Sequence, residues 1–171
     1  MDSRENLSKN KKIGFLASFS QGYEMLKFAI SKETIKFIAS SKSDKTKYKR
    51  KIEDINLKNK IKLFQDVEDK KDEFTQFLET QNFDLIFLSW WPNIISEKLI
   101  NKVRIGWVNL HPSYLPYGRG KHQYFWSIID GTPFGVTLHF IDKGIDTGPI
   151  LFQKTIKVQF QDTGETLYQK A

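Results

Sequence analysis

An asparagine and a histidine lie two residues apart in the segment Asn109-Leu110-His111-Pro112-Ser113. The run IGWVNL, Ile105–Leu110, contains Asn109 and predicts a strand that leads into His111, and the period of two in a strand puts both side chains on the same face. An amide beside an imidazole suits acyl transfer to an amine, because the amide stabilises the tetrahedral oxyanion and the imidazole accepts the amine's proton. The alternative is that His111 only caps the turn before Pro112, since an isolated N-x-H motif has low specificity.

A second polar segment, Gly135 to Gln153 (GVTLHFIDKGIDTGPILFQ), ends an extended run in a glycine-flanked loop that carries Asp142 and Asp146. A carboxylate beside a histidine orients the imidazole and fixes its tautomer. Asp-Lys-Gly and Asp-Thr-Gly are also common turn formers, so the residue types alone leave a plain polar turn open. His139 lies inside the extended run, and we interpret it as a structural residue that packs behind the site.

The rest of the chain alternates between short apolar runs and amphipathic stretches. The runs predict strands at Lys12–Ala17, Thr34–Ala39, Ile61–Phe64, Asp84–Leu88 and Ile105–Leu110. The amphipathic stretches predict helices at Tyr23–Ile30, Lys45–Ile55, Val67–Thr80, Ile94–Val103 and Gln123–Ile129. Strands that alternate with helices form parallel sheets with right-handed crossovers, so we expect an α/β, doubly wound, Rossmann-like fold.

The pattern changes late in the chain, where Phe134–Asp142 and Pro149–Val158 are extended segments with no helix between them. We therefore expect a mostly parallel sheet with a late antiparallel or mixed portion. Ligands of such sheets bind at the carboxyl ends of the strands, which directs attention to Ser89 and Leu110. No G-x-G-x-x-G motif follows the first strand, so a dinucleotide site of the NAD type is not expected.

The 171-residue composition fits one compact domain, residues 12–171, after a polar tail at residues 1–11. The sequence has no Cys, which excludes disulfides, thiolate zinc ligands and a cysteine nucleophile. No stretch approaches the roughly 18 apolar residues of a spanning helix, and no secretory signal is recognisable, so we expect a cytoplasmic protein without a membrane partner. The net charge of +7 is spread along the chain, which favours a solvated surface over a nucleic-acid site.

Several of these motifs occur together in one order. The string NLHPSYLPYGRG, followed by FWSIIDGTPFGVTLHFIDKGIDTGPILFQ, resembles the folate-dependent formyltransferase family. The resemblance covers Asp84 to Gln153 and is only topological before that. The HPS, LP, G-x-T-x-H and D-x-G elements stand in the family's order, which is more specific than any one motif. Carried over by position, the family's Asn, His and Asp fall on Asn109, His111 and Asp146.

The resemblance implies a metal-free transfer of the formyl group of 10-formyltetrahydrofolate to a primary amine. Asn109 and protonated His111 would donate hydrogen bonds to the oxyanion, and Asp146 would orient the imidazole and help to relay the proton. The donor would bind the segment after the fourth strand and the loop before the catalytic Asp, largely through main-chain groups. The implied donor-site residues are Trp90, Trp91, Asn93, Ile95, Asp142 and Gly144. A core position for one of the two tryptophans is the alternative.

Candidate acceptor-binding residues are Ser18, Ser20, Arg119 and Lys121. Ser18 and Ser20 lie where a strand gives way to a helix N-terminus, which suits an anion, and helix capping by serine is the alternative. Arg119 and Lys121 would contact acceptor phosphates or order the loop LPYGRGKHQ. This loop resembles the amino-sugar branch of the family, which implies a nucleotide-linked amino deoxy sugar as acceptor, of the kind used in lipopolysaccharide biosynthesis. A homodimer is an open expectation.

Three alternative functions stay open: phosphoribosylglycinamide formyltransferase, formyltetrahydrofolate hydrolase with water as acceptor, and a non-catalytic truncated relative. The segment TGETLYQKA from Thr163 to Ala171 predicts a helix capped by Thr163, and the sequence ends after about two turns. Family catalytic domains continue beyond this point. We therefore expect a catalytic domain that is truncated at its C-terminus.

Overall fold

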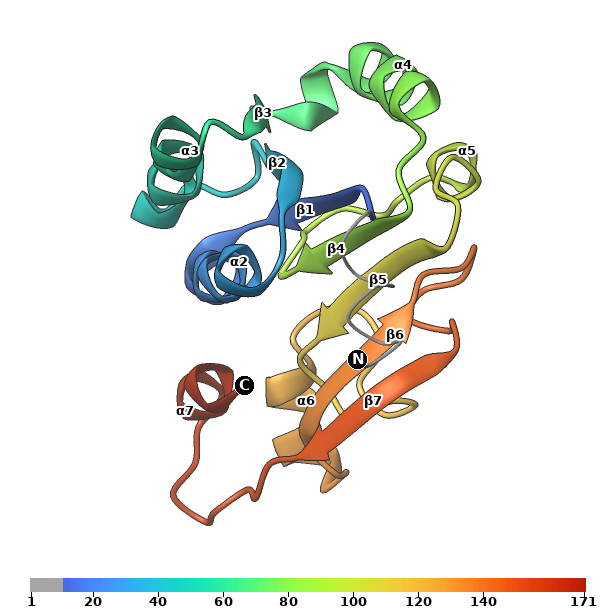
Figure 1. Ribbon diagram of the computed structural model, residues 1–171. Helices are drawn as coiled ribbons and strands as arrows, with labels where there is room; N and C mark the ends of the chain where they lie inside the picture. The colour runs from blue at the N-terminus through green and yellow to red at the C-terminus, as the bar shows by residue number, and fades with distance from the viewer. Residues whose placement is uncertain (1–10) are drawn as a thin grey trace, which may run out of the picture. The chain divides into compact units, whose positions relative to one another are not determined.

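The computed structural model describes residues 11–171, and the predicted polar tail lies outside the described residues except for Lys11. The strands follow the order β3-β2-β1-β4-β5-β6-β7 in a seven-stranded sheet (Figure 1). The chain divides into two compact units, residues 1–107 and residues 108–171. The predicted α/β class and the late antiparallel portion of the sheet are confirmed.

Strands and helices alternate throughout the first unit. Its elements are β1 Ile13–Ala17, α2 Phe19–Lys32, β2 Ile35–Ser40, α3 Lys47–Asn59, β3 Lys62–Phe64, the short 3-10 helix η1 Val67–Asp69, α4 Lys71–Gln81, β4 Leu85–Ser89 and α5 Glu97–Ile100. β1 pairs in parallel with both β2 and β4, and β2 pairs in parallel with β3. Because Ala17 is in register with Ser40 and with Ser89, three strands end at the same edge of the sheet.

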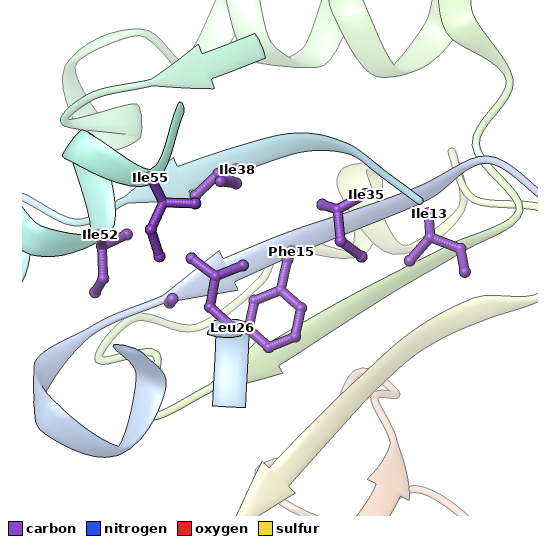
Figure 2. Close-up of a cluster of buried hydrophobic side chains, with 8 residues drawn as sticks. Ile13, Phe15, Leu26, Ile35, Ile38, Ile52 and Ile55 are labelled. Carbon is purple, nitrogen blue, oxygen red and sulfur yellow. The ribbon is translucent and has the colours of Figure 1, made fainter. Parts of the chain in front are cut away.

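Helices cover both faces of the strands in this unit, since all five residues of β1 are buried. On one face, Ile13 and Phe15 of β1 pack with Leu26 of α2 and with the isoleucines of β2 and α3 (Figure 2). A second cluster is aromatic and surrounds Phe37, whose ring lies 4.8 Å from that of Phe83 between centroids. Gly14 leaves room for the Phe37 ring, because a Cβ atom at this position would overlap that ring.

The second unit contains an antiparallel sheet. Its elements are β5 Gly106–His111, which begins within the first unit, then α6 Gln123–Asp130, β6 Gly135–Phe140, β7 Ile150–Thr155 and α7 Gly164–Lys170. β6 pairs antiparallel with β5 and with β7. The predicted Thr163 cap of α7 is confirmed, because its hydroxyl accepts from Thr166 N–H while the Thr166 hydroxyl accepts from Thr163 N–H.

Several predicted helix boundaries are wrong. The helix expected at Ile94–Val103 is reduced to the four residues of α5, and the one expected at Val67–Thr80 is divided between η1 and α4. α2 begins four residues earlier than Tyr23, and α3 extends to Asn59. Apolar periodicity locates a helix better than it locates its ends, which depend on caps and local turns. Among the described residues, no helix is both long and apolar enough to cross a membrane.

Candidate active site

The three predicted catalytic residues all belong to the second unit. Asn109 and His111 lie on β5, two residues apart, and Asp146 lies in the loop between β6 and β7. The Nε2 atom of His111 lies 3.6 Å from Oδ2 of Asp146. Both side chains are largely buried, with exposed fractions of 7% and 15%. The structure therefore brings an imidazole and a carboxylate from distant parts of the sequence to within ion-pair distance.

The imidazole of His111 is held by the loop that follows β5. Its Nε2 atom lies 2.9 Å from the carbonyl oxygen of Gly118, which can only accept, so Nε2 carries a proton in this contact. The carboxylate of Asp146 is held by the same loop, because Gly120 N–H donates to its Oδ2 at 2.8 Å. Gly118 and Gly120 have φ values of +62° and +84°, which explains the two glycines of the GRG step.

Asp146 itself adopts a left-handed backbone conformation with φ of 50°. This conformation costs a residue with a side chain roughly 1–2 kcal/mol, so surrounding contacts must hold it. One of them is the main-chain hydrogen bond from Gly120. The backbone strain thus falls on the residue that turns its carboxylate toward the two histidines.

His139 was predicted to pack behind the site, but its ring contacts residues of the site directly. It lies directly opposite Asn109 in the antiparallel pairing of β5 and β6. Its Nδ1 atom donates to the carbonyl of Phe140 at 2.8 Å, which leaves Nε2 as an acceptor for the Asn109 amide at 3.3 Å. The same Nε2 atom lies 3.6 Å from Oδ1 of Asp146. His139 therefore contacts two of the three predicted catalytic residues.

Burial lowers the pKa of His139, and the hydrogen bond to Phe140 and the charge of Asp146 oppose this shift only in part. The neutral imidazole is the form that accepts a hydrogen bond from Asn109. The lowered pKa consequently preserves the Asn109 contact at neutral pH. One N–H of the Asn109 amide is then directed to His139, and no side chain or carbonyl in residues 11–171 accepts the other.

Thr137 fastens the turn after β5 to the sheet. Its buried hydroxyl donates to the carbonyl of Ser113 at 2.7 Å and accepts from the N–H of Leu115 at 3.1 Å. Gln153 of β7 adds a bond from Nε2 to the carbonyl of Leu115 at 2.7 Å. The Thr of the G-x-T-x-H motif thus fixes the path of the HPS and LP residues.

Asp142 and Gly144, predicted to bind the donor, shape the loop between β6 and β7. The Asp142 carboxylate accepts from the hydroxyl of Thr147 at 2.6 Å and from the N–H of Gly144 at 2.9 Å. These bonds hold the pKa of Asp142 below its ordinary value, the Thr147 bond contributing most. A side chain at Gly144 would overlap Thr147. Both residues therefore define the loop that carries Asp146.

The other predicted donor-site residues lie in the first unit, after β4. Trp90 and Trp91 are half-buried, Trp90 with a left-handed φ of 54°, and Ile95 is buried at 8% exposure. The Nδ2 atom of Asn93 contacts Oε1 of Glu68 at 2.5 Å and the Ser41 hydroxyl at 3.1 Å. The Asn93 amide is thus bound within the protein, which the sequence did not indicate.

The expected anion site at Ser18 and Ser20 is not what the structure shows. Ser18 is fully buried, and the N–H of Phe19 donates to the Asp44 carboxylate at 2.6 Å. The hydroxyl of Ser20 donates to the side chain of Gln21. A carboxylate of the protein therefore occupies the start of α2, where an anionic ligand would meet like charge. The serine-capping alternative is wrong too, since the Ser18 side chain makes no capping hydrogen bond.

Arg119 and Lys121 are exposed in the second unit, within the loop that holds His111 and Asp146. Their neighbours Gly118 and Gly120 make main-chain contacts to His111 and Asp146. Of the described residues, no group of three or more His, Cys, Asp or Glu side chains is arranged to hold a metal ion.

Sequence reasoning did not identify Gly118, Gly120, Asp44 or Glu68 as residues of interest, and it gave His139 a lesser role. One signal for His139 was available, because His139 and Asn109 both lie in segments predicted to be extended, and residues of neighbouring strands can pair side by side. The contacts of Asp44 and Glu68 depend on loops whose paths no periodic pattern predicts.

Comparison with known proteins shows the family to which the chain belongs. Residues 11–171 match a family model described as "Formyl transferase". A methionyl-tRNA formyltransferase of Thermodesulfovibrio yellowstonii is 37% identical over 59% of this chain and 33% of its own length. A GDP-perosamine N-formyltransferase of Brucella melitensis is 35% identical over 58% of this chain and 39% of its own length. The matched regions thus span only about a third to two fifths of the length of these relatives.

Solved structures show the same fold. The phosphoribosylglycinamide formyltransferase of Streptococcus pneumoniae superposes with a TM-score of 0.77 and 22% sequence identity. The match covers 94% of this chain and 90% of that protein. At this level of identity the similarity establishes the fold alone.

Proposed function

The chain belongs to the formyl transferase family, and on this ground we propose that it transfers a formyl group from 10-formyltetrahydrofolate to a primary amine of a nucleotide-linked amino deoxy sugar. One observation carries the proposal: His111 and Asp146 lie 3.6 Å apart, and His139 links Asp146 to Asn109. An amide, an imidazole and a carboxylate are therefore gathered within one unit of the structure.

The proposed reaction forms a bond between the acceptor nitrogen and the formyl carbon, and breaks the bond from that carbon to N10 of the folate. The free N–H of Asn109 donates to the oxyanion of the tetrahedral intermediate. His111, in its protonated form, is the second donor, and Asp146, whose Oδ2 lies 3.6 Å from Nε2, orients its imidazole. Asp146 also helps to relay the proton of the amine to the departing N10, so that tetrahydrofolate leaves neutral at that nitrogen.

Two observations favour a sugar nucleotide as the acceptor. The GDP-perosamine N-formyltransferase relative is 35% identical over its matched region. Arg119 and Lys121 are exposed in the loop that contacts His111 and Asp146, where a diphosphate would find two cations. The start of α2 does not offer an equivalent place, because Asp44 occupies it.

The proposal is tested by incubating the longest available form of the chain with 10-formyltetrahydrofolate and a panel of acceptors. The panel contains amino deoxy sugars linked to nucleotides, phosphoribosylglycinamide, and water alone. We expect formylated sugar nucleotide, detected by mass spectrometry, with release of tetrahydrofolate. If phosphoribosylglycinamide is the only compound formylated, it is the acceptor and the proposed sugar nucleotide is wrong. Release of formate when only water is present would indicate a formyltetrahydrofolate hydrolase.

A second candidate acceptor is the amino group of an aminoacyl-tRNA. Two observations favour it: a methionyl-tRNA formyltransferase is 37% identical over its matched region, and α3 exposes Lys47, Arg50 and Lys51 in its first two turns. Cations at this density attract phosphate backbones through counterion release. If tRNA is the acceptor, formylated aminoacyl-tRNA will form, and the rate will fall steeply as salt rises. No product from tRNA at low salt would exclude it.

A further inference from the structure

Three side chains from separate connecting segments meet in the first unit. Ser41 follows β2, Glu68 lies in η1 after β3, and Asn93 follows β4. The Nδ2 atom of Asn93 donates to Oε1 of Glu68 at 2.5 Å, and the hydroxyl of Ser41 donates to the same oxygen. Nδ2 of Asn93 also donates to Oγ of Ser41 at 3.1 Å. We call Ser41, Glu68 and Asn93 the loop cluster.

The loop cluster is attached to the backbone as well as to itself. The second carboxylate oxygen of Glu68 accepts from the N–H of Lys42 at 3.1 Å. Oγ of Ser41, a fully buried residue, accepts from the N–H of Ser43 at 3.1 Å. Glu68 therefore joins the loop after β2 to the segment after β4, and hydrogen bonds to a charged acceptor are the stronger kind.

These bonds fix the orientation of the Asn93 side chain. Its Nδ2 atom faces Oε1 of Glu68 and Oγ of Ser41, which are themselves joined by a hydrogen bond, so both acceptors lie on the same side of the amide. Residues 90–96 around it form no helix or strand, so their path depends on contacts of this kind. What the segment can present to a ligand is chiefly its main chain and the two tryptophans.

We propose that Glu68 is a positioning residue for the formyl donor. Through Asn93 it holds the main chain of residues 90–95 in the shape that receives the folate. Asn93 then acts by fixing the path of the segment. This inference rests on the proposed function, since it assumes that the segment after β4 binds 10-formyltetrahydrofolate.

The test exchanges the hydrogen-bond donor and acceptor groups of Asn93 and Glu68. Asn93→Asp places a carboxylate against the carboxylate of Glu68, so we expect the Kd for 10-formyltetrahydrofolate to rise about tenfold or more, with kcat at saturating donor within about twofold. Adding Glu68→Gln returns a donor N–H opposite the new carboxylate, and Ser41 can reverse its hydroxyl to suit either arrangement. The double variant should recover donor binding to within about threefold of the natural chain.

Donor binding is measured by calorimetric titration with 10-formyltetrahydrofolate, and thermal unfolding is recorded for every variant. Asn101→Asp, which makes the same change of charge at an exposed residue after α5, is the matched control. Unchanged donor binding in Asn93→Asp, or no recovery in the double variant, would overturn the positioning role alone. If the natural chain neither binds the folate nor transfers a formyl group, the proposed function is wrong and this inference falls with it.

Discussion

At the scale of single residues, the arrangement around Asp146 decides what the site can do. Two histidine Nε2 atoms lie 3.6 Å from its two carboxylate oxygens, one on each. The environments of the two rings differ, because His111 donates to Gly118 whereas His139 accepts from Asn109. His111 thereby donates an N–H, whereas His139 presents an acceptor nitrogen and its lowered pKa keeps it neutral at neutral pH.

Replacement of His111 is the most direct test of this assignment. His111→Ala removes both the second oxyanion donor and the group that Asp146 orients, so we expect kcat to fall at least 10²-fold, roughly the range of general acid–base catalysis. Circular dichroism and the thermal midpoint should show a folded protein. A variant that retains natural turnover would contradict the site assignment.

His139 is expected to act through Asn109. In His139→Phe the Asn109 amide loses its acceptor, and we expect kcat to fall roughly tenfold, less than for loss of an oxyanion donor itself. His139→Gln supplies a carbonyl oxygen that can accept from the same amide, so it should recover part of the rate. Steady-state kinetics of both variants, with Asn109→Ala as reference, provides the measurement. Equal rates for the Phe and Gln variants would argue against orientation of Asn109 by His139.

At the scale of elements, the antiparallel pair β5 and β6 does most of the positioning. It places Asn109 opposite His139 and His111 opposite Thr137, so two pairs across the strands build the centre of the site. The Thr137 hydroxyl then fixes the following turn through Ser113 and Leu115. Loops contribute the remaining groups, Gly118, Gly120 and Asp146, through main-chain bonds.

Thr137→Val tests this anchoring, because valine keeps the shape of threonine and removes the hydroxyl. The buried carbonyl of Ser113 and the N–H of Leu115 then lose a partner, so we expect destabilisation of about 1–3 kcal/mol. The turn should also lose its fixed path, lowering kcat. Chemical denaturation and kinetics check the two effects, and Thr155→Val on β7, an exposed position, is the control. A stable variant with natural kcat would show that Thr137 does not position the site.

At the scale of the whole molecule, the alternation of strands and helices and the late antiparallel strands were predictable from the sequence, and the contacts of the loops were not. Alternating apolar runs indicate parallel strands, and the spacing of Asn109 and His111 indicates a shared face. Asp44, which contacts the start of α2, comes from the loop after β2, and Glu68, which contacts Asn93, comes from η1 after β3. Such contacts depend on tertiary packing, which periodicity does not encode.

The stability of the molecule should depend on pH in two separate ranges. Burial lowers the pKa of His139, so the unfolded chain binds a proton more readily than the folded one. Stability from this group is complete above its unfolded pKa of about 6.5 and is lost as the pH falls from there toward the lower folded value. The groups that face His139 are Asp146 and Asp142, which oppose the shift, and His111, which adds to it.

Carboxylates act in the more acidic range. The pKa of Asp162 is lowered to about 2 by its bonds to Lys170 and neighbouring groups, and that of Asp84 is lowered chiefly by the N–H of Lys12. Stability from these groups is complete above about pH 4 and is lost as the pH falls through their folded values. Denaturation by urea between pH 2 and 8, followed by circular dichroism, should show both ranges. His139→Gln should abolish only the loss of stability that begins at about pH 6.5. If the variant still loses stability in that range, a group other than His139 is responsible.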